Sequence, residues 1–493
     1  MRWRDFDALE PLPPTFFQSP RRVHFIGVGG IGMSALAFVL QSRGHIVSGS
    51  DANESAMTQK LRDSGIRVLV GHDAEHLRDN GQLCEAVVFG SAISEDNLER
   101  VAAQQNGVPQ WHRAQILAFF VNTAENSIAV SGTHGKSTTS ALIAHILVEC
   151  GFNPTAILGA EYPPFDSNVR LGSHDLVVVE ADESDGSFTL LRPSVAVVTN
   201  VEAEHLENYN DSEDELWRAF GIFIDNARDA VILNADDKPL SERFNADEQE
   251  LSYGLEDGLL QARNILVGGG YARFDLEYRM GSGPQLIGNY ALGAPGRHNI
   301  SNALAAICAA TTQDGEFPQA YARAGESLAD FYGVRRRFQR IGEANRVLVV
   351  DDYAHHPTEV ATTLNSAREY LERPIVAVFQ PHRYSRTQQM GHEFGPAFVA
   401  AERIIVTQLY SAWEEPIEGV SGRIVFDSVR ETFPGKDVRY AENLDEARQL
   451  ALEMAQPGDV IICLGAGDIT TLPPLLLHDL QEKERVAASA PDV

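Results

Sequence analysis

The chain has 493 residues, about three times the ~150 residues of a typical domain, so its length predicts two to four domains with sizeable cores. Hydrophobic residues make up 44% and charged residues 22%, as in globular proteins, and no apolar run approaches the ~18 residues that span a bilayer. The 40 Lys and Arg against 69 Asp and Glu give a net charge of −29, which disfavours nucleic acid and membranes as partners, so an anionic substrate needs a local basic site.

The cysteines and the chain ends favour a cytoplasmic protein. The four cysteines are far apart in the sequence and lack metal-site spacing, which is typical of reduced thiols. The first residues, MRWRDFDALEPLPPTFFQSP, contain acids and prolines and lack the apolar stretch of an export signal. The last residues, QEKERVAASAPDV, are polar and without periodicity, so we expect a frayed tail there.

The first segment, residues 20–120, opens with a strand, a glycine-rich turn, a helix ending near Gly44 and a second strand reaching Asp51. The turn fits G-x-G-x-x-G, and an acid follows about 20 residues later. Its glycines let backbone N–H groups approach a diphosphate at the start of the helix. The pattern specifies a diphosphate more than it specifies NAD. The three glycines of the pattern are Gly27, Gly29 and Gly32.

A second glycine turn lies between a strand and a helix that is expected from Thr138 to Gly151. The loop Gly132–Ser137 resembles a phosphate-binding P-loop but is shorter than G-x-x-x-x-G-K-[ST]. Successive N–H groups there would hold phosphate, Lys136 would contact the outer phosphates, and Ser137 could ligate Mg²⁺. The alternative is an ordinary glycine turn followed by a chance lysine.

Two apolar strands follow, and polar residues gather where each strand ends. If the strands are parallel, these residues face the same crevice as the phosphate loop. A carboxylate there is well placed for Mg²⁺, and we favour Glu180, although spacing alone cannot select it. For His205 the alternative is an ordinary surface or core histidine. The residues at these strand ends are Glu180, Asp182, Glu183, Asn200 and His205.

The third segment alternates strands with helical stretches, which again indicates a mostly parallel sheet. Adjacent side chains on an extended chain point in opposite directions, so His355 and His356 are not expected to share a metal ion. A substrate contact or a helix-start role is favoured, because Pro357 and Glu359 open the next helix. The polar residues at these strand ends are Asp351, Asp352, Tyr353, His355, His356, His382, Arg383 and Arg386.

Nine short blocks together resemble the Mur ligases, the ATP-dependent amide-bond formers of peptidoglycan synthesis. The blocks are HFIGVGGIGMSALA, SGTHGKSTT, VVEADESDGSF, TNVEAEHLENY, APGRHNISNALAA, GVRRRFQ, VDDYAHHPTEV, FQPHRYSRT and LGAGDIT. The resemblance implies an α/β fold with three domains: a Rossmann-like N-terminal domain for the UDP-sugar (20–120), a central P-loop ATPase-like domain (121–335) and a Rossmann-like C-terminal closing domain (336–480).

The same resemblance assigns site residues by motif. The UDP-sugar would be bound by Gly27, Gly29, Gly30, Gly32, Asp51, His72 and Ser91. ATP would be bound by Gly132, Thr133, His134, Gly135, Lys136, Ser137, Thr138, Asn299, Asn302, Arg337 and Asp352. Magnesium would be held by Ser137, Glu180 and His205, and catalysis would use Lys136, Glu180, His205 and Arg337. The amino acid and the reacting carboxylate would meet Tyr353, His356, Arg383 and Arg386.

The resemblance also implies a reaction. The blocks look most like the branch that joins L-alanine to the lactyl carboxylate of UDP-N-acetylmuramate through an acyl phosphate, with ATP and Mg²⁺ as cofactors. The nearest alternative is the recycling branch, which adds a whole tripeptide to the same UDP-sugar. A nicotinamide oxidoreductase would leave the phosphate loop without a purpose, and a non-catalytic nucleotide-binding scaffold would not need the acidic and basic residues together. Monomer and homodimer both remain open.

Overall fold

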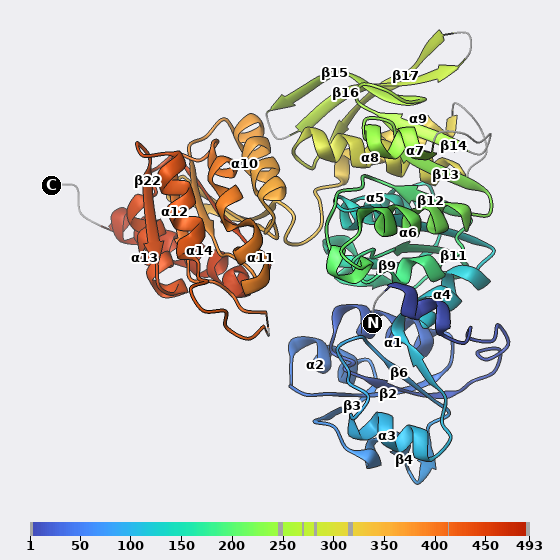
Figure 1. Ribbon diagram of the computed structural model, residues 1–493. Coiled ribbons are helices and arrows are strands. Elements are labelled where there is room, and N and C mark those ends of the chain that lie inside the picture. The colour runs from blue at the N-terminus through green and yellow to red at the C-terminus, as the bar shows by residue number, and fades with distance from the viewer. Residues whose placement is uncertain are drawn as a thin grey trace. The chain divides into compact units, whose positions relative to one another are not determined.

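The computed structural model describes residues 3–244, 250–268, 271–280, 283–313, 319–412 and 414–489 (Figure 1). The chain forms two compact units. One comprises the chain up to Asn264 together with Phe274–Tyr290 and Ile300–Phe331, and the other comprises Ile265–Arg273, Ala291–Asn299 and the chain from Tyr332 onward. Within the described ranges, no helix is both long enough and apolar enough to cross a bilayer.

The N-terminal sheet is parallel, with strand order β3-β2-β1-β6-β7. The strand order reverses at β1, which pairs with β2 on one side and with β6 on the other. Ligands bind at such switch points of parallel sheets. The strands are β1 (Arg22–Ile26), β2 (Ile46–Asp51), β3 (Arg67–Val70), β6 (Ala86–Phe89) and β7 (Gln110–His112). The helices are α1 (Ile31–Ser42), α2 (Ala56–Asp63), α3 (Leu98–Gln105) and α4 (Arg113–Thr123), and a small ladder joins β4 (Arg78–Asp79) to β5 (Gln82–Leu83).

The central sheet has the order β10-β9-β11-β8-β12-β13-β14-β15-β16-β17. From β9 to β14 neighbouring strands are parallel, and a second switch point lies at β8. The strands are β8 (Asn126–Ser131), β9 (Pro154–Tyr162), β10 (Ser167–Arg170), β11 (Ser173–Glu180), β12 (Val195–Val198), β13 (Ala230–Asn234), β14 (Glu250–Gly254), β15 (Leu260–Gly268), β16 (Tyr271–Met280) and β17 (Gly283–Leu292). The helices are α5 (Lys136–Glu149), α6 (Glu213–Asp225), α7 (Lys238–Phe244), α8 (Arg297–Thr311) and α9 (Gln319–Glu326).

The third sheet has the order β18-β19-β23-β20-β21-β22, parallel except for β18. The strands are β18 (Gln339–Ala344), β19 (Val347–Asp352), β20 (Ile375–Phe379), β21 (Arg403–Thr407), β22 (Asp437–Ala441) and β23 (Val460–Leu464). The helices are α10 (Pro357–Leu371), α11 (Tyr384–Met390), α12 (Arg423–Thr432), α13 (Leu444–Met454) and α14 (Leu472–Ser489). Runs such as Val460–Leu464 are wholly buried because helices cover both faces.

Two segments differ from the sequence-based expectation. The prediction of a frayed tail is wrong for residues 481–489, which continue α14 as a helix. Leu476 and Leu480 anchor the first half of α14 in the core, and the polar half extends the same helix into solvent. The rest of that predicted tail, residues 490–493, lies outside the described residues. Trp3 and Phe6, which precede the predicted start of the first domain, are buried.

Candidate active site

The glycine turn after β1 is held by the end of β2. The N–H groups of Gly27 and Val28 both donate to the carbonyl of Ser50, at 2.8 and 2.9 Å. The N–H of Gly29 donates to the Asp51 carboxylate at 2.9 Å. Gly30 precedes α1 without a side-chain cap, so the first N–H groups of this helix are directed at the turn. Asp51 therefore shapes the predicted diphosphate turn directly.

A buried carboxylate lies beneath this turn. Glu99 of α3 accepts a hydrogen bond from Ser50 at 2.6 Å and lies 2.8 Å from His76 and 3.7 Å from His24. Its carboxylate is also 3.5 Å from His72, a predicted UDP-sugar residue. Burial alone would raise the pKa of Glu99, but the nearby His24 ring and the hydrogen bonds of Ser50 and His76 hold it at about 2. Glu99 therefore stays ionised, and links His72 to the turn.

Ser91 belongs to the same wall. It follows β6, and its hydroxyl lies 3.0 Å from Nε2 of His112. Nδ1 of His112 accepts from the N–H of Ala114 at the start of α4, which places the ring proton on Nε2. Burial lowers the pKa of His112 to about 4, so the ring is neutral and donates to Ser91. The Ser91 hydroxyl hydrogen is therefore available to donate elsewhere.

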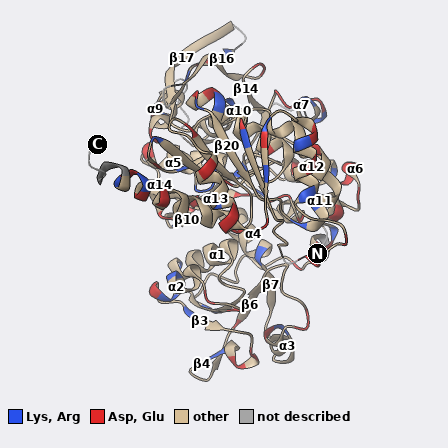
Figure 2. Cartoon of the chain, turned by 90° about the vertical axis from the view of Figure 1, so that its left-hand side faces the viewer, with Lys and Arg blue, Asp and Glu red and all other residues tan. Residues whose placement is uncertain are grey.

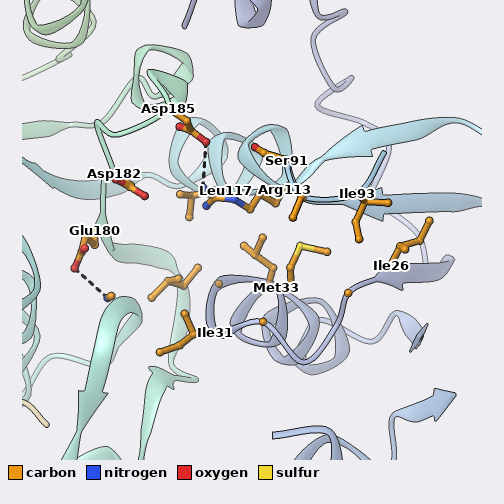
Figure 3. A pocket seen from close by; sticks show the side chains of 18 of the residues that line it. Ile26, Ile31, Met33, Ser91, Ile93, Arg113, Leu117, Glu180, Asp182 and Asp185 are labelled. Carbon is orange, nitrogen blue, oxygen red and sulfur yellow. Dashed lines mark hydrogen bonds and ion pairs between the residues drawn. The ribbon is translucent and has the colours of Figure 1, made fainter. Parts of the chain in front are cut away.

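A pocket of about 540 Å³ connects the N-terminal and central sheets within the first unit. One wall is formed by the glycine turn, the start of α1 and the loop after β6, and the opposite wall by β9 and the end of β11 (Figure 3). Apolar side chains line its middle, and carboxylates stand at the β11 end. The lining includes the predicted site residues Gly27, Gly30, Gly32, Ser91 and Glu180.

The phosphate loop connects β8 to α5, and α5 begins at Lys136, two residues before the expected start. Asn200 fixes the loop at His134: its side-chain oxygen accepts from the His134 N–H at 2.8 Å, and its side-chain nitrogen donates to the His134 carbonyl at 3.0 Å. The Thr133 hydroxyl accepts from the Glu202 N–H at 2.8 Å. The residues that follow β12 therefore hold the loop open around the start of α5.

Two glycines are required in this loop. Gly132 has φ +132°, and a Cβ there would overlap the hydroxyl of Thr199. Gly135 has φ +84°, and its Cβ would stand 2.6 Å from the side-chain oxygen of Asn302 on α8. The predicted ATP residue Asn302 thus lies against the loop. Asn299, one turn earlier on α8, donates to the carbonyl of Pro295 at 2.6 Å.

Lys136 lies among carboxylates. Its ammonium is 2.7 Å from Glu183 and donates to the carbonyls of Gly132 and Thr133. Burial would lower the pKa of Lys136, but Glu183, Asp182 and Glu180 together raise it, so the lysine remains charged. Ser137 and Thr138 follow it in the first turn of α5.

The predicted metal residues lie on the neighbouring loops of the central sheet. Glu180 ends β11, where its carboxylate accepts from the Gly159 N–H at 3.1 Å (Figure 3). His205 has φ +56° and stands 3.8 Å from Glu204 and 3.9 Å from Glu207. Burial lowers the pKa of His205, but the carboxylates of Glu207 and Glu183 raise it overall.

The second unit contains the remaining predicted residues. Asp352 is buried at the end of β19 and accepts from the N–H groups of Phe338 and Ala354, at 2.6 and 2.8 Å. Burial raises the pKa of Asp352 to about 6, against the pull of Arg337. Arg337 stands 3.6 Å from Glu359, and its guanidinium lies 5.3 Å from the centre of the Tyr353 ring.

The predicted histidines and arginines at the ends of β19 and β20 lie at or near the starts of α10 and α11. His356 caps α10 by accepting from the Thr358 N–H, which is the helix-start role favoured from the sequence. Arg383 precedes α11 with φ +70°, and its N–H donates to the Tyr410 carbonyl. The His382 ring stacks on Tyr410. Burial lowers the pKa of His382 to about 4, as do the neighbouring Arg386 and Arg383.

Comparison with known proteins identifies the family. Residues 22–124 match the Mur ligase family catalytic domain, 130–310 the Mur ligase middle domain and 336–467 the Mur ligase glutamate ligase domain. The chain is 41% identical to the UDP-N-acetylmuramate–L-alanine ligase of Carboxydothermus hydrogenoformans, over 92% of this chain and 96% of that protein. The chain belongs to the Mur ligase family.

Other relatives agree. This Mur ligase is 43% identical to the ligase of the same name from Rubrobacter xylanophilus, over 93% of this chain and all of that protein. A crystal structure of UDP-N-acetylmuramate-alanine ligase from Thermotoga maritima matches with TM-score 0.79 and 30% identity, covering 94% of this chain and 100% of that one. A murein peptide ligase from Psychrobacter arcticus shares the fold, with TM-score 0.65 and 24% identity. The predicted family, its three-domain α/β fold and the class of ATP-dependent amide-bond-forming ligase are confirmed.

Sequence reasoning passed over two charged residues of this Mur ligase. Arg113, the first residue of α4, lines the pocket and pairs with Asp185 at 3.2 Å. Glu99 lies in the first turn of α3, in a stretch that has no motif. Arg113 could have been found from its position directly after the end of β7, where parallel strands place ligand-binding residues. Nothing in the sequence around Glu99 distinguishes it from a surface acid.

Proposed function

We propose that this Mur ligase joins L-alanine to the lactyl carboxylate of UDP-N-acetylmuramate, with ATP converted to ADP and phosphate through an acyl phosphate. The observation that carries this proposal is a single pocket lined by both the glycine turn and Glu180. A UDP-sugar with its diphosphate at the turn would direct its carboxylate toward the acids that surround Lys136. Relatives named for this reaction, 41–43% identical to this chain, support the choice of substrates.

The chemistry explains the need for both ends of the pocket. A carboxylate does not react with an amine at neutral pH, because it is a poor electrophile without a useful leaving group. Transfer of the γ-phosphoryl group of ATP to the carboxylate would give an acyl phosphate, and attack by the alanine amine would then release phosphate. Such an intermediate must be formed away from water, which would hydrolyse it.

The phosphate loop would hold ATP. Its N–H groups are kept in place by Asn200, and Lys136 supplies the positive charge that the outer phosphates require. Asn302 lies against the same loop, as the family motif requires of a nucleotide contact. From the second unit, Arg337 and Asp352 are proposed to reach ATP, and Tyr353, His356, Arg383 and Arg386 the amino acid and the carboxylate.

The acidic surroundings of Lys136 also fit Mg²⁺. Glu180, Asp182 and Glu183 place three carboxylates near one ammonium, an excess of negative charge that a divalent cation would offset. Ser137 and Glu180 offer the oxygen ligands that this hard cation prefers, and His205 stands on the next loop of the sheet. Bound there, the ion would neutralise charge on the transferred phosphoryl group.

The tripeptide-adding branch is the second candidate. The structural match to the alanine-named enzyme has higher TM-score and identity than the match to the murein peptide ligase, 0.79 and 30% against 0.65 and 24%. The two branches share the UDP-sugar and differ in the acceptor, so the acceptor decides between them.

The test measures phosphate release from ATP and Mg²⁺ with UDP-N-acetylmuramate, in the presence of no acceptor, L-alanine or the tripeptide, together with the mass of the product. We expect release only with L-alanine and a UDP-sugar one alanine heavier. Phosphate release only with the tripeptide would assign the enzyme to the recycling branch. No phosphate release with any acceptor would contradict both candidate functions.

Two lysine variants tie the result to the phosphate loop. Lys136→Ala is expected to lower turnover by about 10³-fold, because the transferred phosphoryl group loses its cation, while UDP-sugar binding is retained. Lys238→Ala is the control, since Lys238 is exposed on α7 and pairs with Asp257. Half of the wild-type turnover in Lys136→Ala would contradict the phosphate-loop assignment.

A further inference from the structure

The pocket has an imbalance of charge. Among the described residues that line it, Arg113 is the one Lys or Arg, and Glu180, Asp182 and Asp185 are carboxylates. On the proposed function, its ligand carries a diphosphate and a carboxylate, so the wall would repel it over much of its length. A cation inside the pocket has to offset this repulsion, and Arg113 is positioned to do so.

The guanidinium of Arg113 lies beside the glycine turn. A Cβ built on Gly32 would stand 3.8 Å from Nη1 of Arg113, and one on Gly90 would stand 3.9 Å from its Cδ. Gly32 is the last glycine of the predicted diphosphate pattern and belongs to the first turn of α1. The side chain of Arg113 therefore lies beside the glycine turn. The first N–H groups of α1 are directed at the same turn.

Asp185 orients this guanidinium. Nη2 of Arg113 donates to Oδ2 of Asp185 at 3.2 Å (Figure 3), and Oδ1 of Asp185 accepts from the Ser187 N–H at 3.0 Å. The carboxylate is thus anchored to its own loop independently of the arginine. A guanidinium has five donor hydrogens in a planar fork, so a partner on Nη2 leaves Nη1, the nitrogen beside Gly32, directed at the turn.

The position of Arg113 is fixed from its own helix as well. Arg113 is the first residue of α4, directly after His112, whose side chain caps that helix. The same His112 holds Ser91, a second donor on this wall. One helix start therefore carries the cation and positions a neutral donor next to it.

We propose that Arg113 binds the diphosphate of the UDP-sugar, and that Asp185 is a positioning residue that orients it. The inference deepens the proposed function, since it concerns the same substrate in the same pocket. The alternative is that the pair only ties α4 to the loop after β11. In that case losing either partner would have the same effect, and the effect would not depend on the ligand's phosphates.

The experiment measures binding by isothermal titration with two ligands, UDP-N-acetylmuramate and UDP-N-acetylglucosamine, which has the diphosphate but lacks the lactyl carboxylate. We expect Arg113→Gln to raise the Kd of both ligands by about 10- to 100-fold, as for a lost charge-assisted hydrogen bond. Arg113→Lys, which keeps the charge without the fork, is expected to lie between this variant and the wild type. Asp185→Asn keeps the cation and should raise Kd by about threefold at most.

Arg62→Gln is the matched control. Arg62 on α2 forms an ion pair at 3.2 Å with Glu54 and is 28% exposed, against 3.2 Å and 27% for Arg113, but it does not line the pocket. Its variant should bind both ligands as the wild type does. Melting temperatures establish that each variant is folded. If Arg113→Gln does not fold, the Kd of Arg113→Lys is compared with that of Asp185→Asn instead.

Three results would overturn the proposal. A loss confined to UDP-N-acetylmuramate would assign Arg113 to the carboxylate. An equal loss in the Arg113 and Asp185 variants would mean a structural tie, and unchanged Kd in folded Arg113 variants would remove the residue from the site. Failure of the proposed function looks different: the wild-type protein itself would then make no alanylated product.

Discussion

Two carboxylates, the half-buried Asp51 and the buried Glu99, give the glycine turn its shape at the level of single residues. Asp51 accepts directly from the turn, whereas Glu99 acts through Ser50, whose carbonyl holds two N–H groups of the same turn. The carboxylate of Glu99 also lies 3.7 Å from His24 and 2.8 Å from His76, which belong to two other elements. The ionised side chain of Glu99 on α3 therefore connects its own helix with β1, β2 and the short helix Ala74–Leu77.

Stability should depend on pH through Glu99. Its folded pKa of about 2 is below its ordinary value of 4.5, so its ionised form stabilises the fold above pH 4.5. This contribution is lost as the pH falls from about 4.5 through about 2. Glu99→Gln should lower the free energy of unfolding at neutral pH by about 1–3 kcal/mol, because buried donors lose a charged acceptor.

Urea unfolding of the wild type and Glu99→Gln, repeated at several pH values, measures this effect. The difference in the free energy of unfolding between the two proteins should be constant from neutral pH to about 5 and should become smaller below pH 5. A gap that is independent of pH down to about 3 would mean that the charge of Glu99 is not what stabilises this region.

Single residues were predictable only where a local pattern carries them. The glycines and Lys136 follow from spacing, because a phosphate-binding turn is built from consecutive residues. Arg113 and Asp185 are 72 positions apart and Ser50 and Glu99 are 49 apart, so neither pair has a local signal. Such partnerships depend on sheet order, which the sequence does not state.

Two strand ends define the site at the level of elements. The glycine turn follows β1 and the phosphate loop follows β8, and each of these strands is the switch point of its sheet. Buried apolar runs predicted these strands, because a parallel sheet covered on both faces needs them. β15, β16 and β17 were not predicted, since their partly exposed residues lack such runs.

The pairing of β9 with β11 gives a prediction about Glu180. A Cβ on Gly159 of β9 would overlap the Glu180 carboxylate, which accepts from the Gly159 N–H. Gly159→Ala should therefore displace that carboxylate and lower kcat by about 10-fold or more, with little change in the melting temperature. Steady-state kinetics and thermal melts measure both effects.

Gly435→Ala is the control for this substitution. Gly435 has open space around its would-be Cβ and φ outside the left-handed region, so its variant should retain wild-type kinetics. If Gly159→Ala turns over as fast as Gly435→Ala, the position of Glu180 does not matter for catalysis.

Charge dominates the behaviour of the whole molecule. Acidic side chains occur on helices of both units, including α6 and α14 (Figure 2), and the net charge is −29. Both proposed nucleotide ligands are polyanions, so the field of the protein opposes their approach even though the site itself contains Lys136 and Arg113.

Association should therefore become faster with added salt. Screening of the long-range repulsion is expected to raise the association rate constant of UDP-N-acetylmuramate several-fold between about 0.01 and 0.2 M NaCl, where the Debye length falls from about 30 Å to below 10 Å. Stopped-flow fluorescence measures this rate, with uridine as the uncharged control. A rate that falls with salt would mean that the local cations outweigh the net charge at long range.

Asn200 has a thermodynamic consequence for the phosphate loop. Because it bonds both the N–H and the carbonyl of His134, the backbone of the loop loses its conformational freedom when the protein folds. The loop is therefore already ordered before a nucleotide binds, so nucleotide binding does not include the entropic cost of ordering it.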